Sequence, residues 1–359
     1  MKNLILIAIL FLGIVACQNE TVNSNNGGIS GTLTQANGTP GEILVSIDNA
    51  LWKGDIEAIF KSKFADTAQG PYIFLEHTFD YTQEDPSTIN KVRKKNRNFL
   101  RIILETDVKM DETEAIVKKD FKASGQLYVV IRDSDKARLT QFLNDELKTY
   151  IALFDLEETE RLVKKYQNNP NVNFNNTAKE KFGISISIPS SAKFKANKDS
   201  IIYALDKSVE ESTRDNPKTG AKGGTYWAQR GILIWSSPYV GEESMDPLTI
   251  LATRDTTLKY NVKGTVEGSY MATEYAPSHR PKFEYFDLNG NKAVKIEGLW
   301  RHNGAPGASG GGPFVQYSVV HPTRGTVVHI STHIFAPRFN KREYIRQIRA
   351  MLKTVVVVE

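Results

Sequence analysis

The chain contains one cysteine, Cys17, which directly follows an apolar run. A basic start at Lys2 and the run from Leu4 to Ala16 have the layout of a secretory signal. The run is short for a permanent membrane span, because a helix needs about 20 apolar residues to cross a bilayer. With a single thiol in the chain, disulfides within a monomer are excluded, although an envelope compartment would permit them.

Residues Ile14–Cys17 match the lipobox, in which small residues precede a cysteine that receives the lipid and becomes the new N-terminus. We therefore predict that residues 1–16 are a signal peptide and that Cys17 is lipidated. Two or more acyl chains anchor a protein stably, since each buried CH₂ contributes about 0.8 kcal/mol. The mature protein is expected to sit on a membrane without crossing it. The alternative is a signal cleaved elsewhere, with Cys17 incidental.

The residue after the cysteine bears on which membrane holds the protein. In bacteria of the familiar type an aspartate at this position argues for inner-membrane retention, and this chain has Gln18. Gln18 at this position therefore favours the outer membrane. The sequence leaves open whether the folded body faces the periplasm or the cell exterior.

The composition is that of a soluble globular protein, with 40% apolar and 24% charged residues. The 46 basic and 41 acidic side chains leave a formal charge of +5, which is a slight excess. An exported protein also has little use for nucleic acid, so nucleic acid is not expected as a partner.

Breaks in composition and periodicity divide the chain after the signal peptide. Residues 17–40 are rich in Asn, Gly, Thr and Ser and hold too few apolar residues to offset chain entropy. They are expected to form a flexible tether. The rest divides into an N-terminal half, residues 41–178, and a C-terminal half, residues 179–359, because the polar stretch after Asn168 breaks the helical pattern before it.

The N-terminal half is expected to begin with a strand at Glu42–Ile47 and a helical stretch from Leu51 to Phe60. Its closing helix has apolar residues at helical spacing from Leu139 to Phe154, with Ser134 as the N-cap. Between them, β-rich apolar segments lie at residues 72–81, 98–104 and 126–131.

The C-terminal half opens with a strict alternation of apolar residues and serines. This pattern puts Ile184, Ile186 and Ile188 on the inward face of a strand. Residues 207–224 are charged and Gly-rich, and are expected to form a mobile loop.

Turn and cap signals organise the remainder of this half. Asp246 is a good N-cap for a helix whose first residue is Pro247, and Asn289–Gly290 predicts a type I′ hairpin turn. Further strands are expected at residues 226–236, 269–275, 283–286, 293–300, 314–320 and 326–335, and a closing helix at residues 340–353.

These elements predict an α+β fold, with mostly antiparallel sheets and packed helices, because hairpins recur and regular βαβ alternation is missing. Both halves are expected to run strand, helix, several strands and closing helix. This shared order suggests two similarly built halves.

Gly307–Gly311 satisfies the G-x-S-x-G pattern of serine hydrolases, with Ser309 at the nucleophile position. A nucleophile elbow needs a strand before the serine and a helix after it, whereas residues 312–320 are expected to form a strand. A likeness to the nucleophile loop of trypsin-like proteases also fails, since the upstream His and Asp cannot be identified. Glycines that let a loop turn tightly explain the run, so no catalytic residue is predicted.

Two patterns suggest a metal site. His329 and His333 lie in a β-branched segment, where four residues separate two side chains by roughly 13 Å, too far to share one ion. Asp287–Asn291 resembles the opening of a calcium loop but has neither the flanking helices nor the distal glutamate. His77, which alternates with apolar residues, is expected to be a core histidine rather than a general base. We therefore predict no metal and no cofactor.

A candidate binding region surrounds a glycine-rich loop near residue 307. Trp300 and Phe314 flank this loop, while Arg301, His302 and Asn303 supply hydrogen-bond donors, a mixture that suits a ligand or protein contact. The alternative is that the two aromatic side chains simply pack the strand ends.

The closing helix has a basic face that could meet anionic lipid headgroups. A solvated face is the favoured interpretation, because apolar residues such as Ile345 and Ile348 already give the helix a core-facing side. The basic residues are Lys341, Arg342, Arg346, Arg349 and Lys353.

Several segments together resemble a lipoprotein family of Bacteroidota, catalogued as domain of unknown function 4837. The resemblance implies an envelope lipoprotein of about this length and implies no activity. In one departure, residues 304–310 replace a stretch that more often ends in a bulky residue before Gly-Gly-Pro-Phe. The segments are Gly268–Glu274, Gly298–Arg301, Gly311–Phe314, Ala336–Pro337 and Lys341–Arg346.

Taken together, the sequence favours a non-enzymatic, lipid-anchored component of the cell envelope. Its body is expected to bind a protein or glycan partner, and its membrane contact is expected to run through the N-terminal lipid. The alternative is an envelope hydrolase acting on glycan, peptide or lipid, with acids and bases assembled from distant parts of the chain.

Overall fold

The computed structural model describes residues 33–66, 70–71, 76–212, 224–337 and 339–358, without the side chains of residues 209–226. The predicted signal peptide, Cys17 and most of the predicted tether lie outside the described residues. Residues Thr34–Glu359 form one compact unit. Among the described residues, no helix is both long and apolar enough to cross a membrane.

The first sheet has five strands in the order β2-β1-β3-β5-β4. β1 pairs in parallel with β2 and β3, and β3 pairs in parallel with β5, whereas β4 pairs antiparallel with β5. Two helices, α1 and α2, connect β1 to β2 and supply the long connection that parallel neighbours need. The elements are β1 Glu42–Ser46, α1 Asn49–Trp52, α2 Asp55–Phe64, β2 Asp80–Glu84, the 3₁₀ helix η1 Arg93–Lys95, β3 Asn98–Leu104, β4 Glu114–Lys119 and β5 Leu127–Asp133.

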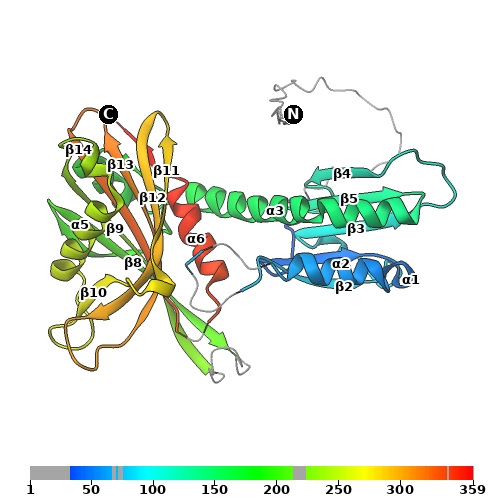
Figure 1. The fold of residues 1–359 in the computed structure, drawn as a ribbon, viewed down its shortest axis with the longest axis horizontal. Helices are drawn as coiled ribbons and strands as arrows, with labels where there is room; N and C mark the ends of the chain where they lie inside the picture. The colour runs from blue at the N-terminus through cyan, green and yellow to red at the C-terminus, as the bar shows by residue number, and fades with distance from the viewer. Residues whose placement is uncertain (1–32, 67–69, 72–75, 213–223, 338, 359) are drawn as a thin grey trace. The chain divides into compact units, whose positions relative to one another are not determined.

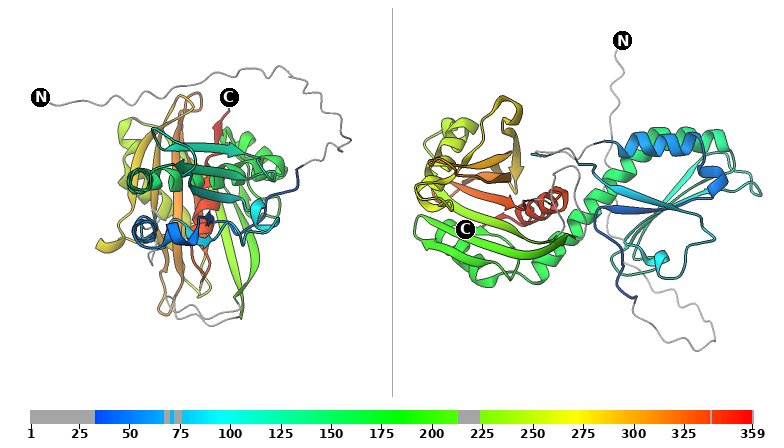
Figure 2. Two further views of the ribbon diagram at one scale, coloured as in Figure 1. Left: turned by 90° about the vertical axis from the view of Figure 1, so that its right-hand side faces the viewer. Right: turned by 90° about the horizontal axis from the view of Figure 1, so that it is seen from below.

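Helices cover one face of the five-stranded sheet (Figure 2). Apolar side chains of α1, α2 and the first part of α3 (Lys136–Asn168) pack there against Leu100 and Val129 of the sheet. The opposite face has a separate, smaller cluster that includes Phe99 and Tyr128. The principal core of this sheet therefore lies between the strands and the three helices.

The second sheet has eight strands, and all its pairings are antiparallel. The main path is β10-β12-β13-β14-β9-β8-β7, and β11 also pairs with β12. The strands are β7 Lys193–Lys198, β8 Ile201–Ser212, β9 Gly224–Pro238, β10 Tyr270–Thr273, β11 Lys282–Leu288, β12 Asn291–Asn303, β13 Gly311–His321 and β14 Thr326–Phe335.

Both faces of the eight-stranded sheet are covered by helices (Figure 1). The helices α4 and α6 pack on one face, where Phe174, Ile345 and Val328 belong to the same core cluster. The helix α5 packs on the other face, where Leu258 belongs to the same cluster as Trp235. The remaining elements are α4 Val172–Phe182, β6 Ile184–Ser185, η2 Glu242–Met245, α5 Pro247–Asn261, η3 Pro277–His279, α6 Arg342–Leu352 and β15 Val356–Val357, which pairs with β6.

The long helix α3 contributes to two cores. Leu143, Leu147 and Phe154 belong to the core of the five-stranded sheet. Further along, Val163 and Tyr166 belong to the core between the eight-stranded sheet and α4 and α6. One helix thus supplies apolar side chains to both sheets.

The predicted α+β class is confirmed. Asp246 caps α5 by accepting a hydrogen bond from the Thr249 amide at 2.9 Å, and Pro247 is the first helical residue. Asn289 and Gly290 both have positive φ, 53° and 84°, as a type I′ turn requires. The three isoleucines of residues 184–188 are buried, as their alternation predicts.

Other local predictions were wrong. The N-cap of α3 is Asp135 and not the predicted Ser134. The Ser134 hydroxyl accepts a hydrogen bond from the Met110 amide instead. Of the predicted loop, residues 207–212 and 224 belong to β8 and β9, which remain paired up to Ser212 and Gly224, and residues 213–223 lie outside the described residues. Backbone pairing with a neighbouring strand outweighs an unfavourable composition in this hairpin.

The two sheets are built differently, so the suggested likeness of the two halves is not seen. Parallel pairs predominate in the first sheet, whereas the second is antiparallel throughout. Residue 178, the predicted boundary, lies inside α4, whose Phe174, Ala178 and Phe182 belong to the core of the eight-stranded sheet.

Candidate functional site

The two aromatic residues of the predicted binding region lie in the core. Trp300 is 3% exposed, and its indole Nε1 donates a hydrogen bond to the Ile334 carbonyl oxygen at 3.0 Å. Phe314 is fully buried, with the Arg254 guanidinium 3.8 Å from its ring centre. Both rings are enclosed by neighbouring side chains, which fits the alternative that they pack the strand ends.

The three polar residues of this region lie at the end of β12. Arg301 is exposed, and its Nε lies 3.4 Å from a carboxylate oxygen of Glu274. Asn303 is also exposed, and its side-chain oxygen accepts a hydrogen bond from the Gly304 amide. His302 is half-buried and packs edge-on against Trp300. A binding role for these three side chains stays a prediction.

His329 and His333 lie on the face of β14 that is covered by α5. The His329 ring is buried between the hydroxyl groups of Ser318 and Ser237, each 2.9 Å from a ring nitrogen. Burial lowers the pKa of both histidines to about 3, so both imidazoles are neutral at physiological pH. Over the part of the chain that the structure describes, no group of three or more His, Cys, Asp or Glu side chains could hold a metal ion.

The Ser237–His329 contact has the separation expected of a nucleophile and its base. An imidazole with a pKa of about 3 is a poor proton acceptor at neutral pH, because general bases work best with a pKa near the working pH. The ring is also held by a second hydroxyl, that of Ser318. The hydrogen bonds therefore satisfy a buried side chain, as buried polar groups require.

Neither Ser309 nor His77 forms a nucleophile–base pair with another described residue. Ser309 is exposed in the loop between β12 and β13, and a strand follows it, as the sequence predicts. His77 is half-buried and precedes β2, so it does not lie in a strand, and its carbonyl oxygen accepts a hydrogen bond from Arg342 at 2.9 Å.

The arginines on the basic face of α6 are paired with carboxylates, whereas Lys353 at the end of the helix is exposed. Arg346 is 5% exposed and binds the carboxylates of Asp155 and Glu343 at 2.8 and 2.6 Å. Arg342 binds Asp80 and Glu343, Arg349 binds Glu297, and Lys353 lies 3.9 Å from Glu160. The prediction of a solvated face was wrong for the three arginines, because carboxylates from other elements, together with Glu343 of α6 itself, bind them.

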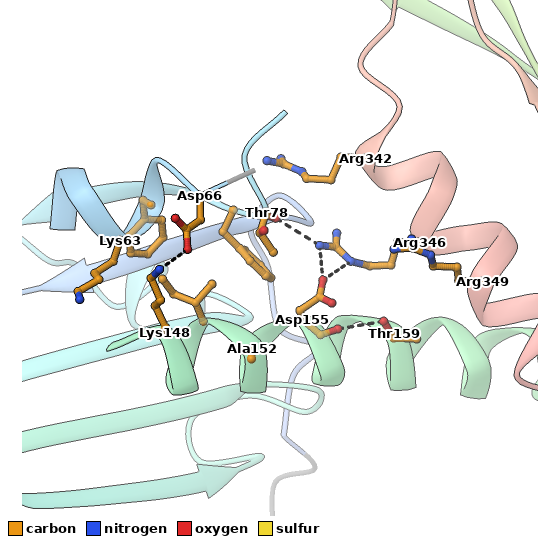
Figure 3. A pocket seen from close by; sticks show the side chains of 13 residues that line it. Lys63, Asp66, Thr78, Lys148, Ala152, Asp155, Thr159, Arg342, Arg346 and Arg349 are labelled. Carbon is orange, nitrogen blue, oxygen red and sulfur yellow. Dashed lines mark hydrogen bonds and ion pairs between the residues drawn. The ribbon is translucent and has the colours of Figure 1, made fainter. Parts of the chain in front are cut away.

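A cleft of about 490 Å³ lies beside α6 (Figure 3). Its volume falls within the range of small-molecule sites. Phe64, Phe79 and Ile151 give it an apolar wall, and the Arg346 guanidinium lies 5.1 Å from the ring centre of Phe79. The other lining residues are Lys63, Asp66, Thr78, Lys148, Ala152, Asp155, Thr159, Arg342 and Arg349.

The arginines and lysines of the cleft differ in their freedom to bind. The guanidinium donors of Arg342 and Arg346 are engaged by carboxylates and by backbone carbonyl oxygens. Lys148 forms an exposed pair with Asp66 at 2.6 Å, and such pairs are worth little and open readily. Lys63 has no ion pair with a described residue. The cleft therefore offers an apolar wall and two accessible ammonium groups beside arginines that are already held in ion pairs.

Sequence reasoning did not find this cleft. Its walls come from α2, the segment before β2, α3 and α6, and no local pattern connects them. The available signal was the spacing of Arg342, Arg346 and Arg349, which repeats at helical intervals on a helix that already has an apolar face.

The family model described as a domain of unknown function (DUF4837) matches residues 171–354. The chain belongs to the DUF4837 family. The DUF4837 match begins at Asn171, the N-cap of α4, and ends just after α6. A second model, also described as a domain of unknown function (DUF8532), matches residues 36–167, which hold the five-stranded sheet and nearly all of α3.

Among curated proteins, none matches this DUF4837 chain. Solved structures give weak likenesses. The Ran-binding protein Mog1p of Saccharomyces cerevisiae is 14% identical, with a TM-score of 0.29 over 49% of this chain and 91% of its own. LpqN of Mycobacterium tuberculosis, described as involved in cell envelope biogenesis, is 15% identical, with a TM-score of 0.24 over 49% and 83%. CyanoP of Synechocystis sp. PCC 6803 is 9% identical, with a TM-score of 0.23 over 46% and 92%.

Proposed function

We propose that the chain is a lipid-anchored component of the bacterial cell envelope that works by binding a partner in the cleft beside α6. The anchor is the lipidated Cys17, and the outer membrane is the favoured location because Gln18 stands where an aspartate would retain the protein at the inner membrane. The residues after Cys17 would act as a tether, since their composition suits a flexible chain.

The observation that supports the binding role is the construction of the cleft. Its guanidinium groups are held in place by carboxylates, and Phe79 packs under one of them. A site whose side chains are already fixed loses less conformational entropy on binding. Lys63 and Lys148 add positive charge at accessible positions. The ligand that fits is a glycan or protein segment with an apolar surface and an anionic group.

The anchor is tested by replacing Cys17 with serine. We expect the wild-type protein to incorporate a labelled fatty acid and to sediment with membranes, and Cys17→Ser to lose both properties. Gln18→Asp provides the companion variant, which should keep the label and move to the inner membrane. An unmodified thiol at position 17 in the wild-type protein would rule the anchor out.

The binding cleft is tested by photo-crosslinking in cells. A photoreactive amino acid at Lys63 or Lys148 should give a discrete adduct, and the same probe at Lys164, an exposed residue of α3, should give none. A probe at Arg301 examines the predicted loop region by the same assay. Adducts from Arg301 with none from either lysine would move the binding site to the end of β12.

Among the described residues, the Ser237–His329 contact favours the hydrolase alternative. A fluorophosphonate probe tests it, because such probes label activated serines. The binding proposal predicts no labelling of the wild-type protein. Labelling that disappears in Ser237→Ala would favour the hydrolase.

A further inference from the structure

The strand order of the five-stranded sheet reverses direction at β1. From β1 the chain passes through α1 and α2 to β2 on one side, and then crosses to β3 on the other side. Connections that leave in opposite directions open a crevice outside the carboxyl ends of the strands, and open α/β sheets bind ligands there. In this sheet the crevice is expected beyond Ser46 of β1 and Leu104 of β3.

The larger of two adjoining cavities occupies this position, and the smaller one lies on the open face of the sheet, near the first residues of β3 and β5. Two adjoining cavities of about 400 and 200 Å³ share Pro86 and Arg101, so Arg101 lies where they meet. The larger cavity reaches the N-terminal ends of α1 and α3, at Asp48 and Lys136. The smaller one reaches Lys94, Phe99, Lys122 and Tyr128 on the face that α1, α2 and α3 leave open. We call the two cavities together the switch-point hollow.

The charges of the switch-point hollow are not compensated. Arg101, Lys94, Lys122 and Lys136 line it, and none of these side chains has an ion pair or hydrogen bond with a described residue. The one lining carboxylate, Asp48, is engaged as the N-cap of α1, where it accepts hydrogen bonds from the Ala50 and Leu51 amides at 2.7 and 3.3 Å. The cleft beside α6 differs, because its arginines are all bound by carboxylates.

The wall of the smaller cavity is aromatic. The rings of Phe99 and Tyr128 stack with their centres 4.8 Å apart, and Phe121 packs against Tyr128. The Lys122 ammonium lies 4.3 Å from the centre of the Phe121 ring. This cation–π contact restrains Lys122, whose charge has no carboxylate partner among the described residues.

We propose that the switch-point hollow is a second binding site, which takes a small oxyanion with two or more negative charges, and that Arg101 is its central ligand. A guanidinium presents a fork of donors that matches a pair of phosphate or carboxylate oxygens. The lysines supply point charges on either side of it. A phosphate ester and a polycarboxylate share this chemistry, and the experiment separates them.

The test uses the full chain purified in detergent and isothermal titration at constant ionic strength. Inorganic pyrophosphate and citrate are the probes, and sodium chloride is the reference. We expect saturable binding of at least one probe, weakened about tenfold or more by Arg101→Gln, since a lost charge-assisted contact of about 1.4 kcal/mol corresponds to tenfold. Binding of pyrophosphate alone assigns the phosphate class, and binding of citrate alone assigns the carboxylate class.

The matched control is Lys164→Gln, which removes the same charge from an exposed position on α3 outside the hollow. Its affinity should equal that of the wild-type protein. If Arg101→Gln alters the urea midpoint, Lys136→Gln provides a second test inside the hollow. It should weaken binding of the probe by a smaller factor than Arg101→Gln. Absence of saturable binding for both probes, or equal weakening by Lys164→Gln and Arg101→Gln, would overturn the proposal.

Discussion

Two glycines of the eight-stranded sheet lie under rings of the neighbouring strand. Gly231 of β9 pairs with His333 of β14, and Gly298 of β12 pairs with Phe314 of β13. A Cβ atom at Gly231 would clash with the His333 ring, and one at Gly298 would clash with the Phe314 ring. The absence of a side chain at these positions therefore lets large rings lie flat on the sheet.

We expect Gly231→Ala to lower the free energy of unfolding by about 1–3 kcal/mol, because overpacking a closed core forces neighbours to shift. Urea denaturation measures the loss. In a His333→Ala background the same substitution should cost much less, since the clashing ring is gone. Equal costs in the two backgrounds would show that the ring and the glycine are not coupled.

The buried histidines predict an acid-sensitive fold. His329 and His333 have a pKa of about 3 in the folded protein, against an ordinary value of 6.5. The unfolded chain therefore binds more protons between these values, and stability falls as the pH drops from about 6.5 towards 3. Above pH 6.5 the two groups have no effect on stability.

Each such histidine contributes a slope on the order of 1.4 kcal/mol per pH unit within that window. We expect His329→Gln to remove one of these contributions, so its stability should fall less steeply than that of the wild-type protein between pH 6 and 4. Urea midpoints at a series of pH values measure the slopes. Parallel curves for the two proteins would contradict the assigned role.

At the scale of elements, α6 is capped from a distant part of the chain. Its own N-cap residue, Lys341, makes no side-chain cap. The carboxylate of Glu76 instead accepts hydrogen bonds from the Lys341 and Arg342 amides at 2.6 and 2.8 Å. A negative charge at this end also interacts favourably with the helix dipole.

Glu76→Ala should lower stability by about 1–3 kcal/mol, because two backbone donors lose their acceptor. Hydrogen exchange should become faster in the first turn of α6 and stay unchanged in α5, which has its own cap at Asp246. Glu76→Gln retains one acceptor oxygen and should lower the free energy of unfolding by less than Glu76→Ala. Unchanged exchange at residues 341–343 in Glu76→Ala would disprove the cap.

Elements with a local signature could be predicted from the sequence. The alternation at Ile184–Ile188, the cap and proline that start α5, and the Asn289–Gly290 turn all depend on neighbouring residues. The strands β4 and β7 escaped prediction because both are largely exposed and lack an apolar face. The ion pairs of α6 with Asp80, Asp155 and Glu297 could not be predicted, because these acidic partners come from other parts of the chain.

At the scale of the whole molecule, Arg346 connects elements of both cores. It lies on α6, which packs on the eight-stranded sheet, and it binds Asp155 of α3 and covers Phe79, a core residue of the five-stranded sheet. Arg346→Met should lower stability by about 2–4 kcal/mol, because two carboxylates lose their buried partner. Thermal and urea unfolding measure the loss.

Lys353→Met is the matched control for this prediction. Its contact with Glu160 is long and the two side chains are 42% and 43% exposed, so the change should be within about 1 kcal/mol. Equal effects of Arg346→Met and Lys353→Met would show that the buried ion pairs contribute no more than surface ones.

The helix α3 supplies apolar side chains to both sheets, from Leu139 to Phe154 for one and at Val163 and Tyr166 for the other. A protein that contained only one of the two sheets would expose the apolar residues of this helix that pack on the other sheet. Exposed apolar patches promote aggregation. Separation of the two coding regions into different genes would therefore be selected against. We expect the two sheets to be encoded together in one gene.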